Sequence, residues 1–382
     1  MSSPSAEDAS GPGLEVPTID ISGFEGEDAA ASARVVSDVR RACESVGFFQ
    51  LVNHGVPEDT LRLAMSAARA FFERPLEEKM AVADLRKGYI PVGGCDNAVR
   101  PTSMHEKFSC ARVDGVDHSD PYYGGDHPQA RLYFGDDNRW PTAPAHFRDA
   151  YVAYYKAMEA LVARLLRVFA VALGSPADFF QTRVDKHVTN LVALWYPPVA
   201  RGDGDEREGQ DARARGGGEV ERVKPHTDPT DVTVLAFERG PEGLQVWPEG
   251  RDGWIDVPST TTAANERSTA LLVNLGDVLR FWTNDRWQST RHRVVVPERR
   301  EGTSGSGEDD GGDRLSLVFF HMPNYDCVVD CEDFGAYVAG PDRPRKYPPF
   351  KSGERSHFAQ LVRGEEGLPD RQTLRPDGSR GD

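Results

Sequence analysis

In the first part of the chain, segments with the apolar spacing of strands follow one another with segments that have the apolar spacing of helices. Residues 16–21 alternate apolar and polar side chains and residues 48–52 form a short apolar run, so both segments predict short strands. Residues 29–45 and 57–72 repeat apolar side chains at helical spacing, and each predicts an amphipathic helix. This part is therefore expected to hold short strands flanked by helices.

A long helix is predicted to separate this part from the rest of the chain. From about residue 143 to residue 173, large apolar side chains recur at helical spacing, and Gly174 follows them as a stop. Such a stripe predicts a helix that packs one face against the core. The preceding residues 88–140 are rich in Gly, Pro, Asp and Tyr without a sustained period, which predicts long loops with short strands.

The second half of the chain has a different pattern, in which short strand-like runs follow one another between turn residues. These runs lie at residues 191–196, 232–237, 244–247, 254–257, 270–275, 278–282, 293–296 and 314–321. Many short strands of this kind are typical of a sandwich, a jelly roll or a barrel. Because no helical pattern intervenes, a doubly wound α/β fold is not expected here.

Polar segments suggest how the chain is divided. Residues 1–13 predict a disordered lead, and two segments with almost no apolar side chains predict mobile insertions in surface loops, at residues 199–223 and 298–313. The predicted units are an N-terminal region at 14–140, the long helix and a connector at 141–184, the β-rich core at 185–350, and a C-terminal helix and tail at 351–382 with a disordered end.

Composition narrows the possible partners. The chain has 382 residues, with 45 Lys and Arg against 61 Asp and Glu, and its formal net charge is −16. This acidic balance argues against a general nucleic-acid binder and against binding to anionic lipid. No apolar run is long enough to span a membrane, and residues 1–13 lack the pattern of a secretory signal. We therefore expect a cytoplasmic protein, with a monomer as the default.

The cysteines are typical of a reducing compartment. Their number is odd and they are scattered without a CxxC motif, so no disulfide framework is expected. They are Cys43, Cys95, Cys110, Cys327 and Cys331. The last two are close in sequence, and a role as small buried apolar residues is favoured over zinc binding.

The strongest candidate for chemistry is the pair His226 and Asp228, followed later by His292. In a strand, residues two apart point to the same face, so an imidazole and a carboxylate can meet one point. Two imidazoles and one carboxylate that leave open positions on a metal are associated with non-haem Fe(II) oxygenases. For an isolated H-x-D match, a surface histidine beside an acid is the commoner explanation.

A second feature strengthens the first. Arg314 and Ser316 share one face of the strand predicted at residues 314–321. A guanidinium presents paired donors that match a carboxylate, and the hydroxyl adds another donor. The alternative is that Arg314 pairs with a surface acid, but its apolar neighbours indicate a largely buried strand, where an arginine needs a partner.

The motifs together resemble the isopenicillin-N-synthase-like family of Fe(II)/2-oxoglutarate-dependent dioxygenases. The resemblance covers roughly residues 14 to 350, in the family's order. The segments that carry it are VPTIDIS, VGFFQLVNHGVP, ARAFFERPLEEK, WYPP, HTDPTDVTVLAF, GLQVW, VNLGDVLRFWTNDRWQSTRHRVV and RLSLVFFHMPN.

The resemblance implies both a fold and a set of roles. The implied fold is mainly β with flanking helices, a distorted double-stranded β-helix or jelly roll. The implied iron ligands are His226, Asp228 and His292. Arg314 and Ser316 would bind the C5 carboxylate of 2-oxoglutarate, and Tyr196 would hydrogen-bond this cosubstrate or would be an ordinary half-buried strand aromatic.

The sequence departs from the family in two places. The family often has a polar residue where this chain has Leu194, so part of the usual polar network is missing. The predicted insertion at residues 298–313 lengthens the connection between His292 and Arg314, which costs little. Some family members keep the Arg-x-Ser pair without using 2-oxoglutarate, so the motif supports iron more strongly than the cosubstrate.

The resemblance implies a reaction but names no substrate. O2 and 2-oxoglutarate would oxidise an unactivated C–H bond of a small metabolite, as in secondary metabolism, by hydroxylation, desaturation or ring closure, and succinate and CO2 would leave. Ascorbate is a candidate reductant. Lys107 could meet an anionic substrate or be a solvated loop charge. The residues that could line the pocket, or could equally be core, are Tyr89, Phe108, Phe281, Phe320 and Met322.

Three functions therefore stand at this point. The first is a 2-oxoglutarate-dependent dioxygenase acting on a small molecule. The second is a non-haem iron oxidase of the same fold that does not use 2-oxoglutarate. The third is a metal-binding jelly roll without turnover, which has no need for open metal positions.

Overall fold

The computed structural model describes residues 15–84, 86–92, 104–114, 116–125, 128–198, 220–238, 242–258, 270–296 and 313–354. The predicted lead, most of both predicted insertions and the chain beyond residue 354 lie outside these ranges.

Two sheets make up the β-rich part of the molecule. The larger sheet has the strand order β1 (Thr18–Asp20), β2 (Phe48–Val52), β10 (Leu271–Leu275), β7 (Val232–Phe237), β12 (Arg314–His321), β5 (Asn190–Tyr196), β4 (Glu106–Cys110) and β3 (Tyr89–Ile90). The smaller sheet has the order β6 (Glu221–His226), β11 (Arg291–Val295), β8 (Leu244–Trp247) and β9 (Ile255–Asp256). A separate pair joins β13 (Val328–Val329) to β14 (Phe350–Lys351).

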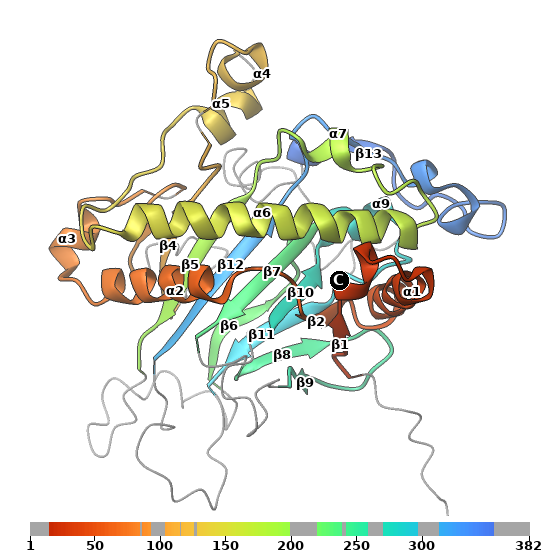
Figure 1. The fold of residues 1–382 in the computed structure, drawn as a ribbon, viewed down its shortest axis with the longest axis horizontal. Coiled ribbons are helices and arrows are strands. Elements are labelled where there is room, and N and C mark those ends of the chain that lie inside the picture. The colour runs from red at the N-terminus through yellow and green to blue at the C-terminus, as the bar shows by residue number, and fades with distance from the viewer. Residues whose placement is uncertain are drawn as a thin grey trace, which may run out of the picture.

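The helices gather mainly on one side of the larger sheet. α6 (Phe147–Ala172) runs across that face, with α2 (Glu58–Phe72) beside it and α1 (Ala29–Ser45) near one end (Figure 1). Phe108 of β4 packs edge-on against Phe147 and Tyr151 of α6, and Trp195 of β5 stacks on Phe72 of α2. Alternate residues of each strand therefore face the helices.

The remaining helical segments are short. They are α3 (Leu76–Met80), α4 (Pro121–Gly124), α5 (Pro128–Phe134), α7 (Gln181–Val184), α9 (Asp277–Trp282), η1 (Ser22–Glu25), η2 (Cys331–Tyr337) and η3 (Ser352–Glu354).

The opposite face of the larger sheet turns toward the smaller sheet. Leu235 and Leu272 of the larger sheet belong to one apolar cluster with Leu244, Val246 and Val294 of the smaller sheet. The two sheets thus enclose an interior that is separate from the helix-covered core. This arrangement, with its flanking helices, is the predicted double-stranded β-helix.

Most predicted elements are present. Residues 29–45 and 48–52 form the predicted helix and strand, and the long helix begins at Phe147, later than predicted. The predicted strand at 278–282 is wrong, because these residues belong to helix α9. The loops predicted over 88–140 also contain the two short helices α4 and α5.

The boundary of the first predicted insertion also needs correction. Residues 221–223 form the start of β6, which pairs with β11, whereas the sequence predicts them as the end of the insertion at 199–223. Arg222 is the one buried residue of β6, and the other residues of this strand are half-buried or exposed. This explains why the segment lacks an apolar pattern. The four cysteines in the described ranges are free and buried, and for Cys327 and Cys331 this burial agrees with the predicted role as small apolar residues.

Candidate active site

The three predicted ligands meet at one point between neighbouring strands. His226 ends β6 and is in register with His292 on β11, and the two rings lie 4.2 Å apart between centroids. The Nε2 atom of each imidazole is 3.7 Å from Oδ1 of Asp228. One ligand atom from each residue lies within 4.8 Å of the other two. The donor set fits a divalent iron, since two imidazoles and one carboxylate leave open positions.

Both imidazoles are oriented by the backbone. Nδ1 of His226 lies 2.8 Å from the carbonyl oxygen of Lys224, and Nδ1 of His292 lies 3.1 Å from that of Thr290. A carbonyl oxygen only accepts, so each Nδ1 carries the proton and donates it. Each Nε2 therefore keeps its lone pair for a metal.

The carboxylate of Asp228 is held from the larger sheet. Its Oδ2 accepts hydrogen bonds of 2.8 Å from Thr233 of β7 and from Asn274 of β10. Burial alone would raise the pKa of this carboxyl, but His292, His226 and these two donors together lower it below its usual value. Asp228 thus stays ionised, with Oδ1 directed at the two imidazoles.

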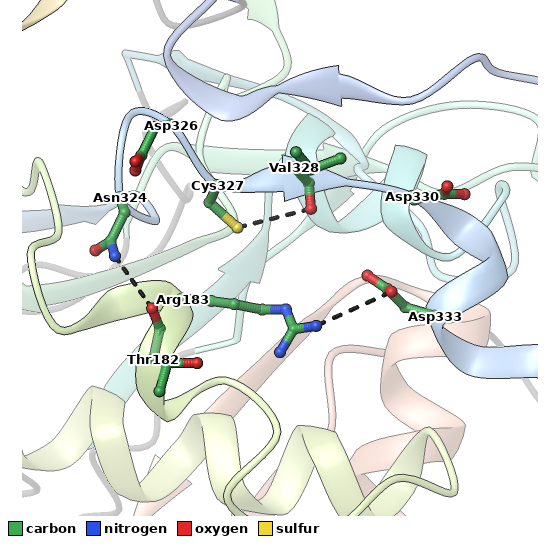
Figure 2. Close-up of a pocket in the computed structure, with 8 residues that line it drawn as sticks. All are labelled: Thr182, Arg183, Asn324, Asp326, Cys327, Val328, Asp330 and Asp333. Atoms are coloured by element: carbon green, nitrogen blue, oxygen red, sulfur yellow. Dashed lines mark hydrogen bonds and ion pairs between the residues drawn. The ribbon is translucent and has the colours of Figure 1, made fainter.

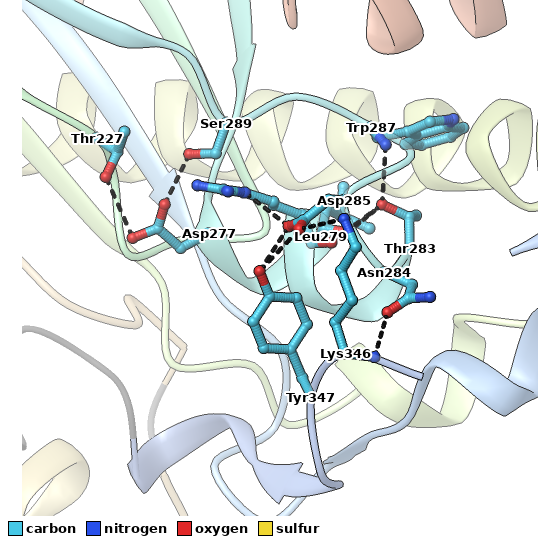
Figure 3. Close-up of polar contacts among 11 residues, drawn as sticks. Thr227, Asp277, Leu279, Thr283, Asn284, Asp285, Trp287, Ser289, Lys346 and Tyr347 are labelled. Atoms are coloured by element: carbon cyan, nitrogen blue, oxygen red, sulfur yellow. Dashed lines mark hydrogen bonds and ion pairs between the residues drawn. The ribbon is translucent and has the colours of Figure 1, made fainter. Parts of the chain in front are cut away.

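A second buried carboxylate organises the residues between the ligands. Asp277 Oδ1 accepts from Ser289 at 2.8 Å, and Asp277 Oδ2 accepts from Thr227 at 3.3 Å (Figure 3). Its own backbone N–H donates to the carbonyl oxygen of Asp228 at 2.8 Å. Asp277 therefore ties the loop after β6 to the segment that leads into β11.

The predicted cosubstrate residues lie together on the larger sheet. Arg314 is directly opposite Tyr196 across β12 and β5, and its guanidinium carbon is 5.1 Å from the ring centre of Tyr196. Ser316 lies opposite Leu194 in the same pairing and is buried. Among the described residues, Arg314 Nε and Ser316 Oγ are buried without a hydrogen-bond partner. Unpaired donors of this kind fit an anion that the structure does not contain.

Strand register shows that these donors share an interior face with the groups around Asp228. Phe320 lies opposite Thr233, and Thr233 lies opposite Asn274. Residues two apart in a strand point the same way, so Arg314, Ser316 and Phe320 share this face. A cosubstrate that reaches from the triad to Arg314 would follow β12.

Two of the predicted pocket residues face the other way. Tyr89 and Phe108 pair across β3 and β4, are buried, and pack against Phe71 of α2. The Tyr89 hydroxyl donates to Glu106 at 2.7 Å. Their place in the helix-side core argues against a role in lining the substrate pocket.

The other pocket candidates are distributed differently. Phe281 of α9 packs against Tyr347 and Phe350, and Met322 follows β12 in the helix-side core. Phe320 is on the interior face, as described above. Lys107 belongs to β4 and is therefore not a loop residue. It lies opposite Leu194 of β5, and Leu194 lies opposite Ser316 of β12, so Lys107 shares the interior face with Ser316.

Sequence reasoning missed four residues near the site. Asn274 could have been noticed as a polar residue inside the apolar run LLVNL of β10. Thr233 and Asp277 had no distinguishing signal beyond their nearness to motif residues. Arg222 lies in the stretch assigned to an insertion, although it is buried on β6.

A separate pocket of about 400 Å³ lies away from the triad and shares no residue with it (Figure 2). Its lining residues are Thr182, Arg183, Asn324, Asp326, Cys327, Val328, Asp330 and Asp333. Arg183 is 4.0 Å from Asp333, so its cation is already paired within the pocket. The lining is rich in carboxylates and is unsuited to an anionic cosubstrate.

Comparison with known proteins gives the family. A model described as the 2OG-Fe(II) oxygenase superfamily matches residues 189–323, and one described as the N-terminal part of the non-haem dioxygenases in morphine synthesis matches residues 16–143. The chain is 33% identical over 348 residues to the 2-oxoglutarate-Fe(II) type oxidoreductase hxnY of Emericella nidulans, covering 87% of this chain and 86% of that protein. This chain belongs to the Fe(II)/2-oxoglutarate-dependent dioxygenases.

Other relatives agree with this membership. The dioxygenase is 30% identical to the validamycin A dioxygenase of Streptomyces hygroscopicus subsp. limoneus, over 80% of this chain and 76% of that protein. A full-length Neurospora crassa protein solved in complex with alpha-KG has a TM-score of 0.69 and 25% identity, covering 89% of this chain and 94% of the other. A putative 2OG-Fe(II) oxygenase family protein of Caulobacter crescentus shares the fold, with a TM-score of 0.69.

Family membership decides among the three functions. The protein is an oxidoreductase that uses Fe(II) and 2-oxoglutarate, so the alternatives without this cosubstrate and without turnover are set aside. The jelly-roll fold expected from the sequence is confirmed. In the described part of the chain, no helix is long and apolar enough to cross a membrane.

Proposed function

We propose that this dioxygenase binds Fe(II) through His226, Asp228 and His292, and oxidises an unactivated C–H bond of a small-molecule metabolite. The observation that carries the ligand assignment is the convergence of two Nε2 atoms and one Oδ1 atom within 4.8 Å. The orientation of each imidazole by a backbone carbonyl supports it.

We further propose that Arg314 and Ser316 bind the C5 carboxylate of 2-oxoglutarate, with Tyr196 beside them. The unpaired buried donors of Arg314 and Ser316 support this role. When bound, iron and cosubstrate supply the oxidising power, with succinate and CO2 as products. The chain orients both ligands and keeps water from the interior.

The substrate class rests on two observations. The interior face that leads from Asp228 to Arg314 is enclosed by two packed sheets, which favours a small molecule over a polymer. The acidic net charge of −16 disfavours an anionic polymer. Hydroxylation is the proposed outcome, with desaturation or ring closure as variants that substrate geometry would select.

An anaerobic titration tests these assignments. Protein freed of metal is titrated with Fe(II) and then with 2-oxoglutarate while the visible spectrum is recorded. We expect a charge-transfer band that requires both ligands, is abolished in Asp228→Ala, and needs far more cosubstrate in Arg314→Ala. Full iron-dependent turnover by Asp228→Ala would contradict the triad, and an unchanged titration of Arg314→Ala would contradict the anchor.

A further inference from the structure

Arg222 brings a second guanidinium into the interior, beside the proposed cosubstrate anchor. It lies on β6 of the smaller sheet and is only 3% exposed. Its guanidinium carbon is 5.9 Å from the ring centre of Tyr196, and that of Arg314 is 5.1 Å from the same centre. The two sheets thus bring two buried cations against one aromatic ring.

The charge of this pair is offset only in part by the described residues, since burial lowers the pKa of Arg314 despite the opposing effects of Tyr196 and Glu242. The Nε atoms of Arg222 and Arg314 are both buried without a hydrogen-bond partner. Burial lowers the pKa of Arg222, and the neighbouring charge of Arg314 lowers it further, against smaller opposing effects of Tyr196 and Asp313. Asp313 already accepts a hydrogen bond of 2.7 Å from Arg69. Because isolated buried charges are costly, an anion is expected between the two arginines.

The larger sheet leaves a place for a donor from the smaller sheet. Leu194, which stands where the family often has a polar residue, lies directly opposite Ser316. Leu194 cannot donate a hydrogen bond, so it adds no donor beside Arg314, Ser316 and Tyr196. Lys107 of β4, which lies opposite Leu194, is a further cation on this face of the larger sheet. Arg222 approaches the same ring from the other sheet.

We propose that Arg222 donates, together with Arg314 and Ser316, to the far carboxylate of 2-oxoglutarate and makes the enzyme selective for 2-oxo acids that carry this second carboxylate. The inference rests on the anchor role of Arg314 and Ser316 proposed above. A carboxylate offers about four lone-pair positions, enough for two guanidiniums and a hydroxyl. Arg222 therefore binds the cosubstrate without touching the metal.

The first test compares two cosubstrates by the anaerobic charge-transfer titration. 2-Oxobutyrate has the same chelating end as 2-oxoglutarate but lacks the far carboxylate. We expect Arg222→Leu to raise the Kd of 2-oxoglutarate about 10- to 100-fold, the range for a hydrogen bond to a charged group, and to change that of 2-oxobutyrate less than about twofold. Arg222→Lys should recover part of the affinity. Arg164→Leu, on α6, is the control and should leave both values unchanged.

The second test uses metal-free protein and glutarate, which has two carboxylates but no keto group. Glutarate should raise the melting temperature of the wild type more than butyrate does, and Arg222→Leu should lose this difference. Without any anion, Arg222→Leu should melt no lower than the wild type, because it removes a buried cation whose charge is only partly offset. If this variant does not fold, Arg222→Lys and the wild-type preference for glutarate carry the test.

The outcomes separate this inference from the proposed function. If Arg314→Leu weakens the charge-transfer band and Arg222→Leu does not, the role of Arg222 is overturned while the proposed function stands. Equal weakening of 2-oxoglutarate and 2-oxobutyrate binding in Arg222→Leu also overturns it, because the effect would then be structural. Absence of any band in the wild type contradicts the proposed function instead.

Discussion

At the scale of single residues, the proposed metal ligands are held in place by groups that are not themselves proposed ligands. Each ligand imidazole donates its Nδ1 proton to the carbonyl oxygen of the residue two positions earlier. Asp228 is fixed by two side chains from neighbouring strands of the other sheet. Groups in this position tune ligand orientation, so their loss should weaken metal binding without removing a ligand.

Thr233→Val tests the contribution of the hydrogen bonds that hold Asp228. Valine has nearly the same shape but removes the hydrogen bond of 2.8 Å to Asp228 Oδ2, while Asn274 retains the other. We expect Fe(II) affinity to fall about 10-fold, the lower end of such effects. Anaerobic titration with Fe(II) measures it. Thr189→Val, at another fully buried threonine, is the control, and an equal loss of affinity there would refute the specific role of Thr233.

Lys87 gives a pH-dependent prediction outside the site. Burial lowers its pKa to about 8, against opposing effects of Asp136, Asp137 and Asp84. In the unfolded chain a lysine binds its proton up to about pH 10.4, so between these values the unfolded state binds more protons and stability rises with pH. Below about pH 8 the folded protein bears the cost of a buried charge.

Lys87→Met should remove this dependence. Relative to the variant, the wild type should gain up to about 3 kcal/mol of unfolding free energy between pH 8 and pH 10.5. Urea denaturation across this range measures the difference. The same substitution at the exposed Lys351 is the control. If the unfolding free energy of the wild type fell relative to that of the variant as the pH rises, the predicted direction of the pH dependence would be wrong.

At the scale of elements, α9 shows where sequence patterns reach their limit. The run VLRFW has strand-like composition, yet its first residues lie against the loop that follows β6. The backbone N–H groups of Gly276, Asp277 and Val278 donate to carbonyl oxygens of residues 231, 228 and 230. These long-range hydrogen bonds satisfy the free donors at a helix start, and no local pattern encodes them.

The same reasoning explains which parts of the site the sequence could predict. His226, Asp228 and His292 stand in recognisable motifs, and strand periodicity placed Arg314 and Ser316 on one face. Arg222 was not predictable, because its burial depends on the facing sheet. The face of Tyr89 and Phe108 depends on pairing register and on α6, which apolarity alone does not specify.

Gly276→Ala tests the junction between α9 and the loop after β6, which carries Asp228. A Cβ atom at this position would lie 2.1 Å from the carbonyl oxygen of Thr230, so the loop that carries Asp228 would have to move. We expect a loss of at least about 2 kcal/mol in unfolding free energy together with weaker Fe(II) binding. Denaturation and iron titration measure the two effects.

Gly26→Ala is the matched control for this prediction. A Cβ atom added at Gly26 would lie 3.8 Å from its nearest neighbour, the carbonyl oxygen of Gly23, and the φ of −74° at Gly26 suits any residue. Its effect on unfolding free energy should stay within about 0.5 kcal/mol. If Gly276→Ala bound iron and unfolded like the control, the close packing of α9 against the loop would be irrelevant to the site.

At the scale of the whole molecule, the site requires three layers to hold their relative positions. The smaller sheet supplies His226, His292 and Arg222, whereas the larger sheet supplies the groups that hold Asp228 and the proposed anchor. The helices cover the far face of the larger sheet (Figure 1). A contact that joins the helices to the strand carrying Arg314 should therefore stabilise the folded protein.

Arg69 of α2 makes such a contact. Its Nε donates to Glu238 at the end of β7 at 2.5 Å, and its Nη1 donates to Asp313, just before Arg314, at 2.7 Å. The guanidinium also lies 4.7 Å from the ring centre of Trp195. The arginine side chain is 23% exposed and its two partners are 24% and 18% exposed, so solvent screens the three charges only in part.

Arg69→Met keeps much of the apolar stem but leaves both carboxylates without their shared cation. We expect the unfolding free energy to fall by about 2 kcal/mol, below the 3–5 kcal/mol typical of a fully buried pair because this cluster is partly solvated. Arg62→Met on the same helix removes an exposed pair with Asp59 and should cost less than about 0.5 kcal/mol. Urea denaturation of both variants measures the contrast. Equal losses would mean that α2 is held to the sheet by apolar packing alone, with no contribution from this cluster.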